Sequence, residues 1–181
     1  MKTLEQRVLD LEAQTHIRTL KAAYMEGCDF HIGAAMGDLF APDGIWEGVG
    51  RFAMPKGPLV GRDAVAREFA SDDGRLTFCA HYLTNEAIKV DGDTATGTWM
   101  FLEPATSSVH GQVWMAGRYR DDFVAIDGRW YIKHLRCKDI FVAPYATGWE
   151  GAAFLDLGWG SQPGEQSDAV PTSGSGIAIQ I

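Results

Sequence analysis

The sequence predicts an α+β domain in which a curved antiparallel sheet wraps around a long N-terminal helix and forms a cone with a cavity. Apolar residues recur at three-, four- and seven-residue steps from Leu4 to Cys28, which is the periodicity of an amphipathic helix. From Leu76 onward the pattern alternates with the period of two that is typical of strands. The pairs Asp91-Gly92 and Asp127-Gly128 separate alternating runs and indicate tight hairpins.

The elements follow one another in a simple order. Three helical segments are expected first, at residues 3–30, at about 34–40, and from Asp63 or the residue before it to a stop at 72–74. Thr3 and Gln6 have the spacing of a capping box. Residues 41–44 predict a turn, Ile45 begins a strand, and 48–61 and 104–110 predict loops. Four more strands are predicted at about 76–90, 93–104, 111–126 and 129–142.

We expect one domain over residues 1–145 and an extension over 146–181. A chain of 181 residues is long enough for a single domain with a substantial core. The extension is aromatic at first and then rich in Gly and Ser. Its apolar residues are expected to cover the cavity mouth or to contact a neighbouring subunit.

Composition and motifs narrow the classes of function. A net charge of −8 and a pI near 5.0 disfavour nucleic acid and anionic membranes as partners, and no apolar run approaches the roughly 20 residues of a membrane span. Three widely spaced cysteines favour a reducing cytoplasm over a disulfide framework. Five scattered histidines lack metal-ligand spacing, and motifs for phosphate, dinucleotides or a hydrolase nucleophile are absent from the sequence. We therefore expect no metal and no cofactor.

His81 is the first candidate for chemistry. It lies in the strand-forming run 78–85, on the same face as Cys79 and Leu83. Such a histidine is either a core residue satisfied by a hydrogen bond or a general base in a cavity, its ring oriented by a carboxylate. Asp29 is predicted at the end of the long helix, where an acid opposes the helix dipole and needs another reason for its position.

Strand alternation sorts the residues that face the cavity. On 93–104 the predicted inner face ends with the carboxylate of Glu103, and on 111–126 the small Gly117 would leave room for a ligand. On 129–142 the inner face stays ambiguous, because Cys137 and Asp139 share a face with Lys133. The opposite face, with His134 and Arg136, is expected to be solvated or to form an interface.

Five short motifs occur in a fixed order: Tyr24-Met-Glu-Gly-Cys-Asp29, Leu39-Phe-Ala-Pro-Asp-Gly-Ile-Trp46, Gly61-Arg-Asp-Ala-Val65, His81-Tyr-Leu-Thr-Asn85 and Asp127-Gly-Arg-Trp-Tyr-Ile132. Together, over about residues 4–145, they resemble the SnoaL-like branch of the nuclear transport factor 2-like superfamily. The nearest resemblance is to the group of hexachlorocyclohexane dehydrochlorinase, bile-acid 7α-dehydratase and scytalone dehydratase. It implies a cystatin-like, cone-shaped α+β barrel and a cofactor-free lyase that is usually a trimer.

The resemblance also implies roles for residues. Asp29 and His81 fall on a catalytic dyad, in which Asp29 accepts one ring N–H of His81 and the other ring nitrogen removes a substrate proton. Tyr24 and Glu103 fall where a protonated side chain would assist a departing hydroxide or hold a substrate hydroxyl. A pocket arginine of the bile-acid dehydratase would fall on Asp139, so the sequence departs from that enzyme's pattern there. The residues expected to contact a hydrophobic substrate are Trp46, Trp99, Phe101, Met115, Tyr119, Leu135 and Asp139.

These residues favour a cofactor-independent lyase that acts on a hydroxylated aromatic or polycyclic molecule. The predicted step is dehydration, or retro-aldol loss of formaldehyde from a phenolic diaryl compound through a quinone methide. An isomerase or cyclase of the same fold is an alternative. So is a non-catalytic protein that binds a ligand or resembles a dioxygenase β-subunit.

Overall fold

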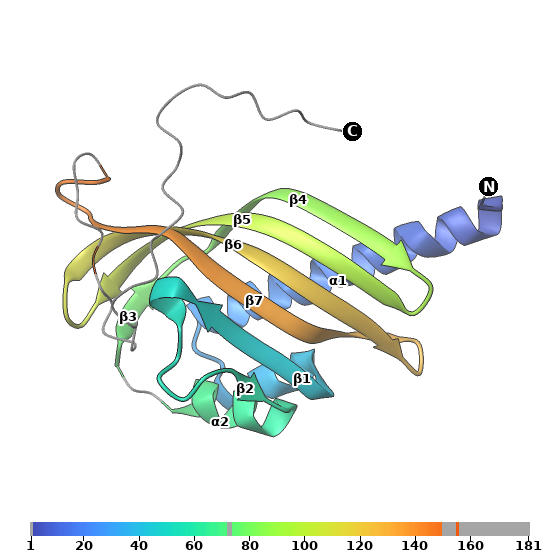
Figure 1. The fold of residues 1–181 in the computed structure, drawn as a ribbon, viewed down its shortest axis with the longest axis horizontal. Helices are drawn as coiled ribbons and strands as arrows, with labels where there is room; N and C mark the ends of the chain where they lie inside the picture. The colour runs from blue at the N-terminus through green and yellow to red at the C-terminus, as the bar shows by residue number, and fades with distance from the viewer. Residues whose placement is uncertain (1, 72–73, 150–154, 156–181) are drawn as a thin grey trace.

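A computed structural model describes residues 2–71, 74–149 and 155, and it has the predicted α+β architecture (Figure 1). Helix α1 (Leu4–Asp29) lies against the inner face of a curled sheet, while η1 (Gly33–Leu39) and α2 (Arg62–Ala70) pack together beside β1. Within the described residues, the sheet order is β2-β1-β7-β6-β5-β3, and β4 also pairs with β5. The remaining elements are β1 (Phe40–Val49), η2 (Gly50–Phe52), β2 (Leu59–Val60), β3 (Leu76–Cys79), β4 (Tyr82–Asp91), β5 (Thr94–Ser107), β6 (Gly111–Ile126) and β7 (Arg129–Pro144).

The long helix begins and ends where the sequence predicts. Thr3 and Gln6 form the capping box, each side chain accepting from the other residue's backbone N–H. The first turns extend past the edge of the sheet, so Leu4 and Leu11 are exposed (Figure 1). The core contact begins near Ala13 and continues to the last turn, which ends at Asp29.

The predicted strand 76–90 is two strands, and the reason lies at His81. Both β3 and β4 pair with β5, but the break between them spans Ala80 and His81. The backbone N–H of His81 donates to the carboxylate of Asp29, at 3.1 and 3.0 Å from its two oxygens. Because that donor points toward α1, it is not available to the β5 ladder.

Residues 41–44, predicted as a turn, lie within β1 but in the irregular stretch between its two contacts with β7. This strand pairs in parallel with β7 at Phe40 and again from Ile45, and the register shifts between the two. The sheet is therefore antiparallel apart from the β1–β7 pair. The loop predicted at 104–110 is also shorter, because β5 continues to Ser107.

Two irregularities in β7 resolve its ambiguous inner face. The register with β6 shifts once near residue 133 and once near residue 140, so the buried residues are Ile132, Leu135, Cys137, Asp139, Val142 and Ala143. A strict period of two could not predict this set. The β6–β7 hairpin is as predicted: positive φ angles of 51° at Asp127 and 77° at Gly128 are those of a two-residue turn with Asp-Gly preference.

Most of the predicted extension lies outside the described residues, which stop at 149 apart from residue 155. Leu155 donates its backbone N–H to the carbonyl of Val142 at 2.9 Å and packs against the core. Trp149 packs against Phe141 on β7. Among the described residues, no helix has the length and apolar character needed to cross a membrane.

Candidate active site

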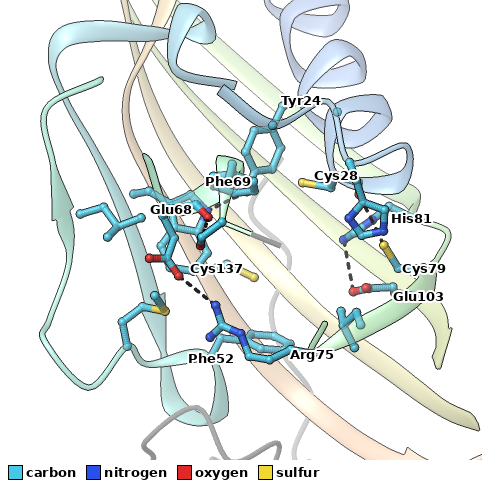
Figure 2. Close-up of a pocket in the computed structure, with 18 of the residues that line it drawn as sticks. Tyr24, Cys28, Phe52, Glu68, Phe69, Arg75, Cys79, His81, Glu103 and Cys137 are labelled. Carbon is cyan, nitrogen blue, oxygen red and sulfur yellow. Dashed lines mark hydrogen bonds and ion pairs between the residues drawn. The ribbon is translucent and has the colours of Figure 1, made fainter. Parts of the chain in front are cut away.

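A cavity of about 640 Å³ lies between α1, α2 and the inner face of the sheet. That volume is in the range of sites for small organic molecules. Aromatic rings make up much of its wall (Figure 2). They are Tyr24, Trp46, Phe52, Phe69, Phe101 and Tyr119. The lining therefore suits a hydrophobic molecule with flat or bulky ring surfaces.

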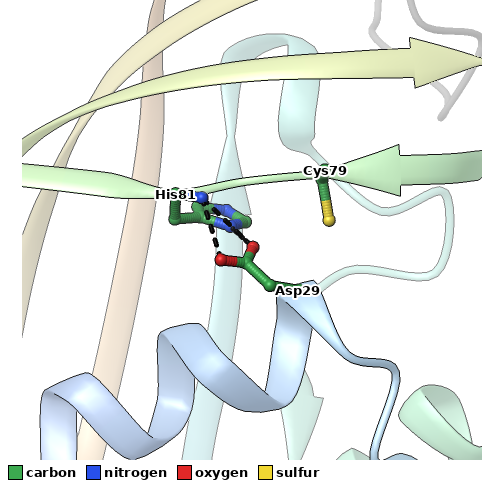
Figure 3. Close-up of side chains that lie close together, drawn as sticks. All are labelled: Asp29, Cys79 and His81. Carbon is green, nitrogen blue, oxygen red and sulfur yellow. Dashed lines mark hydrogen bonds and ion pairs between the residues drawn. The ribbon is translucent and has the colours of Figure 1, made fainter.

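His81 and Asp29 form a close pair at one wall of the cavity. Nδ1 of His81 lies 2.6 Å from Oδ1 of Asp29, in addition to the backbone N–H donated to the same carboxylate (Figure 3). Asp29 is the last residue of α1, and His81 lies in the break between β3 and β4. The side chain of His81 is only 8% exposed. The carboxylate thus fixes the position of the residue through both its ring and its backbone.

Glu103 reaches the other ring nitrogen of the same histidine. Its Oε2 lies 3.2 Å from Nε2 of His81, and its side chain is buried on the inner face of β5, as alternation predicts (Figure 2). The imidazole therefore lies between two carboxylates, one on each nitrogen. Asp29 approaches from the helix and Glu103 from the sheet.

This arrangement shifts the pKa of His81. Burial lowers the pKa, but the negative charge of Glu103 and hydrogen bonding to Cys79 and Glu103 together raise it well above its ordinary value of 6.5. The ring of His81 is consequently protonated at neutral pH when the cavity is empty.

Tyr24 contributes a protonated hydroxyl to the same cavity. Its oxygen accepts a hydrogen bond from Nε1 of Trp46 at 2.7 Å, and burial raises its pKa well above 10. Tyr119, whose pKa is raised by burial as well, packs edge-on against Tyr24. Both phenols stay neutral near pH 7 and can donate hydrogen bonds.

The structure brings some of the predicted substrate contacts to the cavity and leaves others elsewhere. Trp46, Phe101 and Tyr119 line it. The described lining does not include Trp99, Met115, Leu135 or Asp139, which are buried in the core. The expected room beside Gly117 is also filled, because the ring of Phe101 occupies the space where a Cβ would stand.

Asp139 pairs with Arg51 and, contrary to the expectation, is not among the described residues that line the cavity. Its Oδ1 accepts the backbone N–H of Arg51 at 2.9 Å, and its Oδ2 pairs with the guanidinium of the same residue. These bonds tie η2 to β7. Asp139 is therefore the acidic half of an ion pair with Arg51.

Sequence reasoning missed several lining residues. Cys28, Cys79 and Cys137 all reach the cavity, as does an ion pair between Glu68 and Arg75 at 2.8 Å. Figure 2 shows this ion pair across the cavity from His81. The spacing of Cys79, two residues before His81 on one strand face, could have indicated its place. No sequence signal links Glu68 to Arg75.

A helix enclosed by a strongly curled sheet defines the nuclear transport factor 2-like fold, also called cystatin-like. The chain belongs to the family of SnoaL-like domains, whose model matches residues 9–136. In a sequence comparison, no curated protein matches the chain.

Solved structures show the same fold. Hexachlorocyclohexane dehydrochlorinase LinA-type3 from Novosphingobium barchaimii has a TM-score of 0.65 at 19% identity, covering 80% of this chain and 95% of that one. A scytalone dehydratase-like protein from Novosphingobium aromaticivorans has a TM-score of 0.64 at 20% identity, with coverages of 79% and 96%. An NTF2-like protein of the latter organism has a TM-score of 0.59 at 26% identity, with coverages of 84% and 94%.

Proposed function

We propose that the protein is a cofactor-independent lyase that eliminates water from a hydroxylated hydrophobic molecule, with His81 as the base. The observation that carries the proposal is the imidazole of His81 held between Asp29 and Glu103 at the wall of an aromatic cavity. The names of the structural relatives include a dehydrochlorinase and a dehydratase, both of which are elimination enzymes.

The proton on His81 sets the starting state of the reaction. With Asp29 accepting Nδ1–H, the free lone pair of a neutral ring is at Nε2, on the side of Glu103. A bound hydrophobic substrate excludes water, and a water-free cavity favours the neutral pair, Glu103 protonated and His81 neutral, over the charged pair. Binding therefore creates a base and an acid next to each other.

The elimination then balances in one cycle. Nε2 of His81 removes a proton from carbon, the electron pair forms the new double bond, and the carbon–oxygen bond breaks. Glu103 donates its proton to the departing hydroxide, which leaves as water. The proton on Nε2 returns to Glu103 across 3.2 Å, and the site is restored without a net gain or loss of protons.

Asp29 and Tyr24 assist the elimination, and neither gains or loses a proton over the cycle. Asp29 stabilises the imidazolium as it forms and prevents the ring from turning. Tyr24 holds a substrate hydroxyl or helps the leaving group through its neutral phenol. General-base catalysis of this kind contributes about 10²–10⁴ in rate.

The same groups serve a retro-aldol variant. There, His81 takes the hydroxyl proton of a hydroxymethyl group, the adjacent carbon–carbon bond breaks, and formaldehyde leaves. The electron pair of that bond enters a quinone methide of the phenolic substrate, which becomes a phenolate and takes the proton back from His81. We further propose that the protein is cytoplasmic and forms the trimer that the resemblance implies. Sedimentation equilibrium tests the trimer.

The test is an incubation of purified, chelator-treated protein with a panel of hydroxylated aromatic and steroid-like compounds, followed by mass spectrometry. We expect a product that lacks one water, or one formaldehyde in the variant reaction. It should disappear with His81→Ala and persist with His134→Ala, whose side chain pairs with Glu47 on the outer face of the sheet. Ligand binding without any product, in the wild type as in His81→Ala, would favour the non-catalytic binding protein.

A further inference from the structure

Three different donor side chains converge at the end of α1. One ligand atom from each of Asp29, Cys79 and His81 lies within 4.8 Å of the other two. Figure 3 shows Cys79 and His81 extending from neighbouring strand segments toward the carboxylate of Asp29. The proposed lyase mechanism uses the carboxylate and the imidazole but gives no role to the thiol.

We propose that Asp29, Cys79 and His81 bind a thiophilic divalent cation, Zn²⁺, and that this cation switches off the base. The first part rests only on the donor set and its geometry. The second part rests on the proposed function, because it requires that His81 act as a base.

The donor set matches the preferences of zinc. Zn²⁺ takes one sulfur, one imidazole nitrogen and one carboxylate oxygen readily, in a tetrahedral arrangement that leaves a fourth position for water. Cys79 and His81 both line the cavity, so the fourth position can face its interior. Hard cations such as Mg²⁺ select oxygen donors and are not matched by a thiol.

A second observation is the carboxylate behind the histidine. A metal-bound histidine almost always donates its other ring N–H to a carboxylate, a carbonyl or water, and this outer partner raises its basicity. Nδ1 of His81 faces Asp29, while Nε2 lies 3.2 Å from buried Glu103. The ring is therefore oriented as a ligand with its outer partner already in position.

Charge favours a dication at the same place. Two carboxylates flank a single imidazole, so the cluster is negative even when the ring is protonated. On binding, the thiol of Cys79, which donates to the carbonyl of Cys28 at 3.7 Å, gives up its proton to solvent, as does Nδ1 of His81. The metal then bonds to the sulfur and the nitrogen, and Nδ1 can no longer donate to Asp29.

Cobalt is the probe for the site, because Co²⁺ replaces Zn²⁺ and reports thiolate ligation in its ultraviolet charge-transfer band. Chelator-treated full-length protein is titrated with Co²⁺ and then with Zn²⁺. We expect a sulfur-to-cobalt band with tetrahedral visible bands, both displaced by Zn²⁺. Cys79→Ser should abolish the band and weaken Zn²⁺ binding by at least about 10- to 100-fold, the range that loss of an outer partner alone costs in metal sites.

Cys137→Ser is the matched control, because Cys137 is also a buried thiol of the cavity but lies outside the cluster. It should keep the band. Cys79→Ala carries the same test if the serine variant does not fold. Equal Zn²⁺ affinity in Cys79→Ser and Cys137→Ser, or a wild-type protein without the band, would overturn the site. A protein that binds Zn²⁺ through Cys79 but turns over no substrate would refute the lyase and leave the site standing.

Discussion

Replacing Asp29 with asparagine separates the chemistry of the site from its stability. The variant keeps the shape of the side chain but removes the charge that stabilises imidazolium. Its amide can also donate to Nδ1 of His81, which would move the ring proton to Nε2 and remove the base. We expect kcat/KM to fall by about 10²–10⁴, equivalent to about 3–5 kcal/mol of transition-state stabilisation.

The stability of this variant should change much less. Asp29 accepts the ring N–H and the backbone N–H of His81, and a hydrogen bond to a charged group is worth about 1.5–3 kcal/mol. The asparagine oxygen still accepts one of them, and removing an acid from a helix C-terminus returns about 0.3–1 kcal/mol. We therefore expect a net loss of about 1–2 kcal/mol, measured by urea unfolding beside the kinetic assay. A folded variant that keeps its kcat/KM within about threefold of the wild type, well short of the general-base contribution, would refute the dyad.

Three further predictions follow from individual contacts. The Glu103 carboxylate raises the pKa of His81 and burial lowers it, so the ring should lose its proton at lower pH in Glu103→Gln than in the wild type. Because the neutral ring is the base, the activity that the variant retains should begin to rise at lower pH than in the wild type; an unmoved profile would contradict the charge interaction between the two residues. Lys21 and Asp121 form a buried ion pair at 2.8 Å. Lys21→Met should therefore lower the free energy of unfolding by about 3–5 kcal/mol, and adding Asp121→Leu should recover part of that loss. If the two substitutions instead caused additive losses, the ion pair would not explain the stability. Gly117→Ala should lower the free energy of unfolding by about 1–3 kcal/mol in thermal or urea unfolding, because its Cβ would overlap the ring of Phe101 and the carbonyl of Lys138. An unchanged stability would contradict this tight packing.

Local signals account for most of the fold that the sequence predicts. The capping box at Thr3, the helical periodicity and the Asp127-Gly128 hairpin act over a few residues, and each appears as expected. Long-range pairing accounts for the differences. The parallel contact of β1 with β7 brings residues 41–44 into a strand, and no turn signal at those residues can report a partner so far along the chain.

For the candidate site, too, local signals in the sequence predict some residues, whereas others depend on contacts between distant elements. Strand alternation predicts the position of Glu103, and the helix dipole, which disfavours an acid at a helix C-terminus, singles out Asp29. Alternation leaves Asp139 undecided, because its partner Arg51 lies on another element, and it puts Gly117 on the inner face without showing that Phe101 fills the space beside it. Side-chain packing across elements decides such cases, and it leaves no trace in the spacing of one strand.

The tautomer of His81 tests the central claim most directly, because only a ring with its proton on Nδ1 presents a base at Nε2. Nitrogen-15 NMR of histidine-labelled protein, with His81→Gln for assignment, reads both ring nitrogens during a pH titration of the Glu103→Gln variant. We expect Nε2 to lose its proton while Nδ1 keeps its own, held by Asp29. Loss of the proton from Nδ1 instead would leave Nε2 protonated and contradict the assignment of His81 as the base.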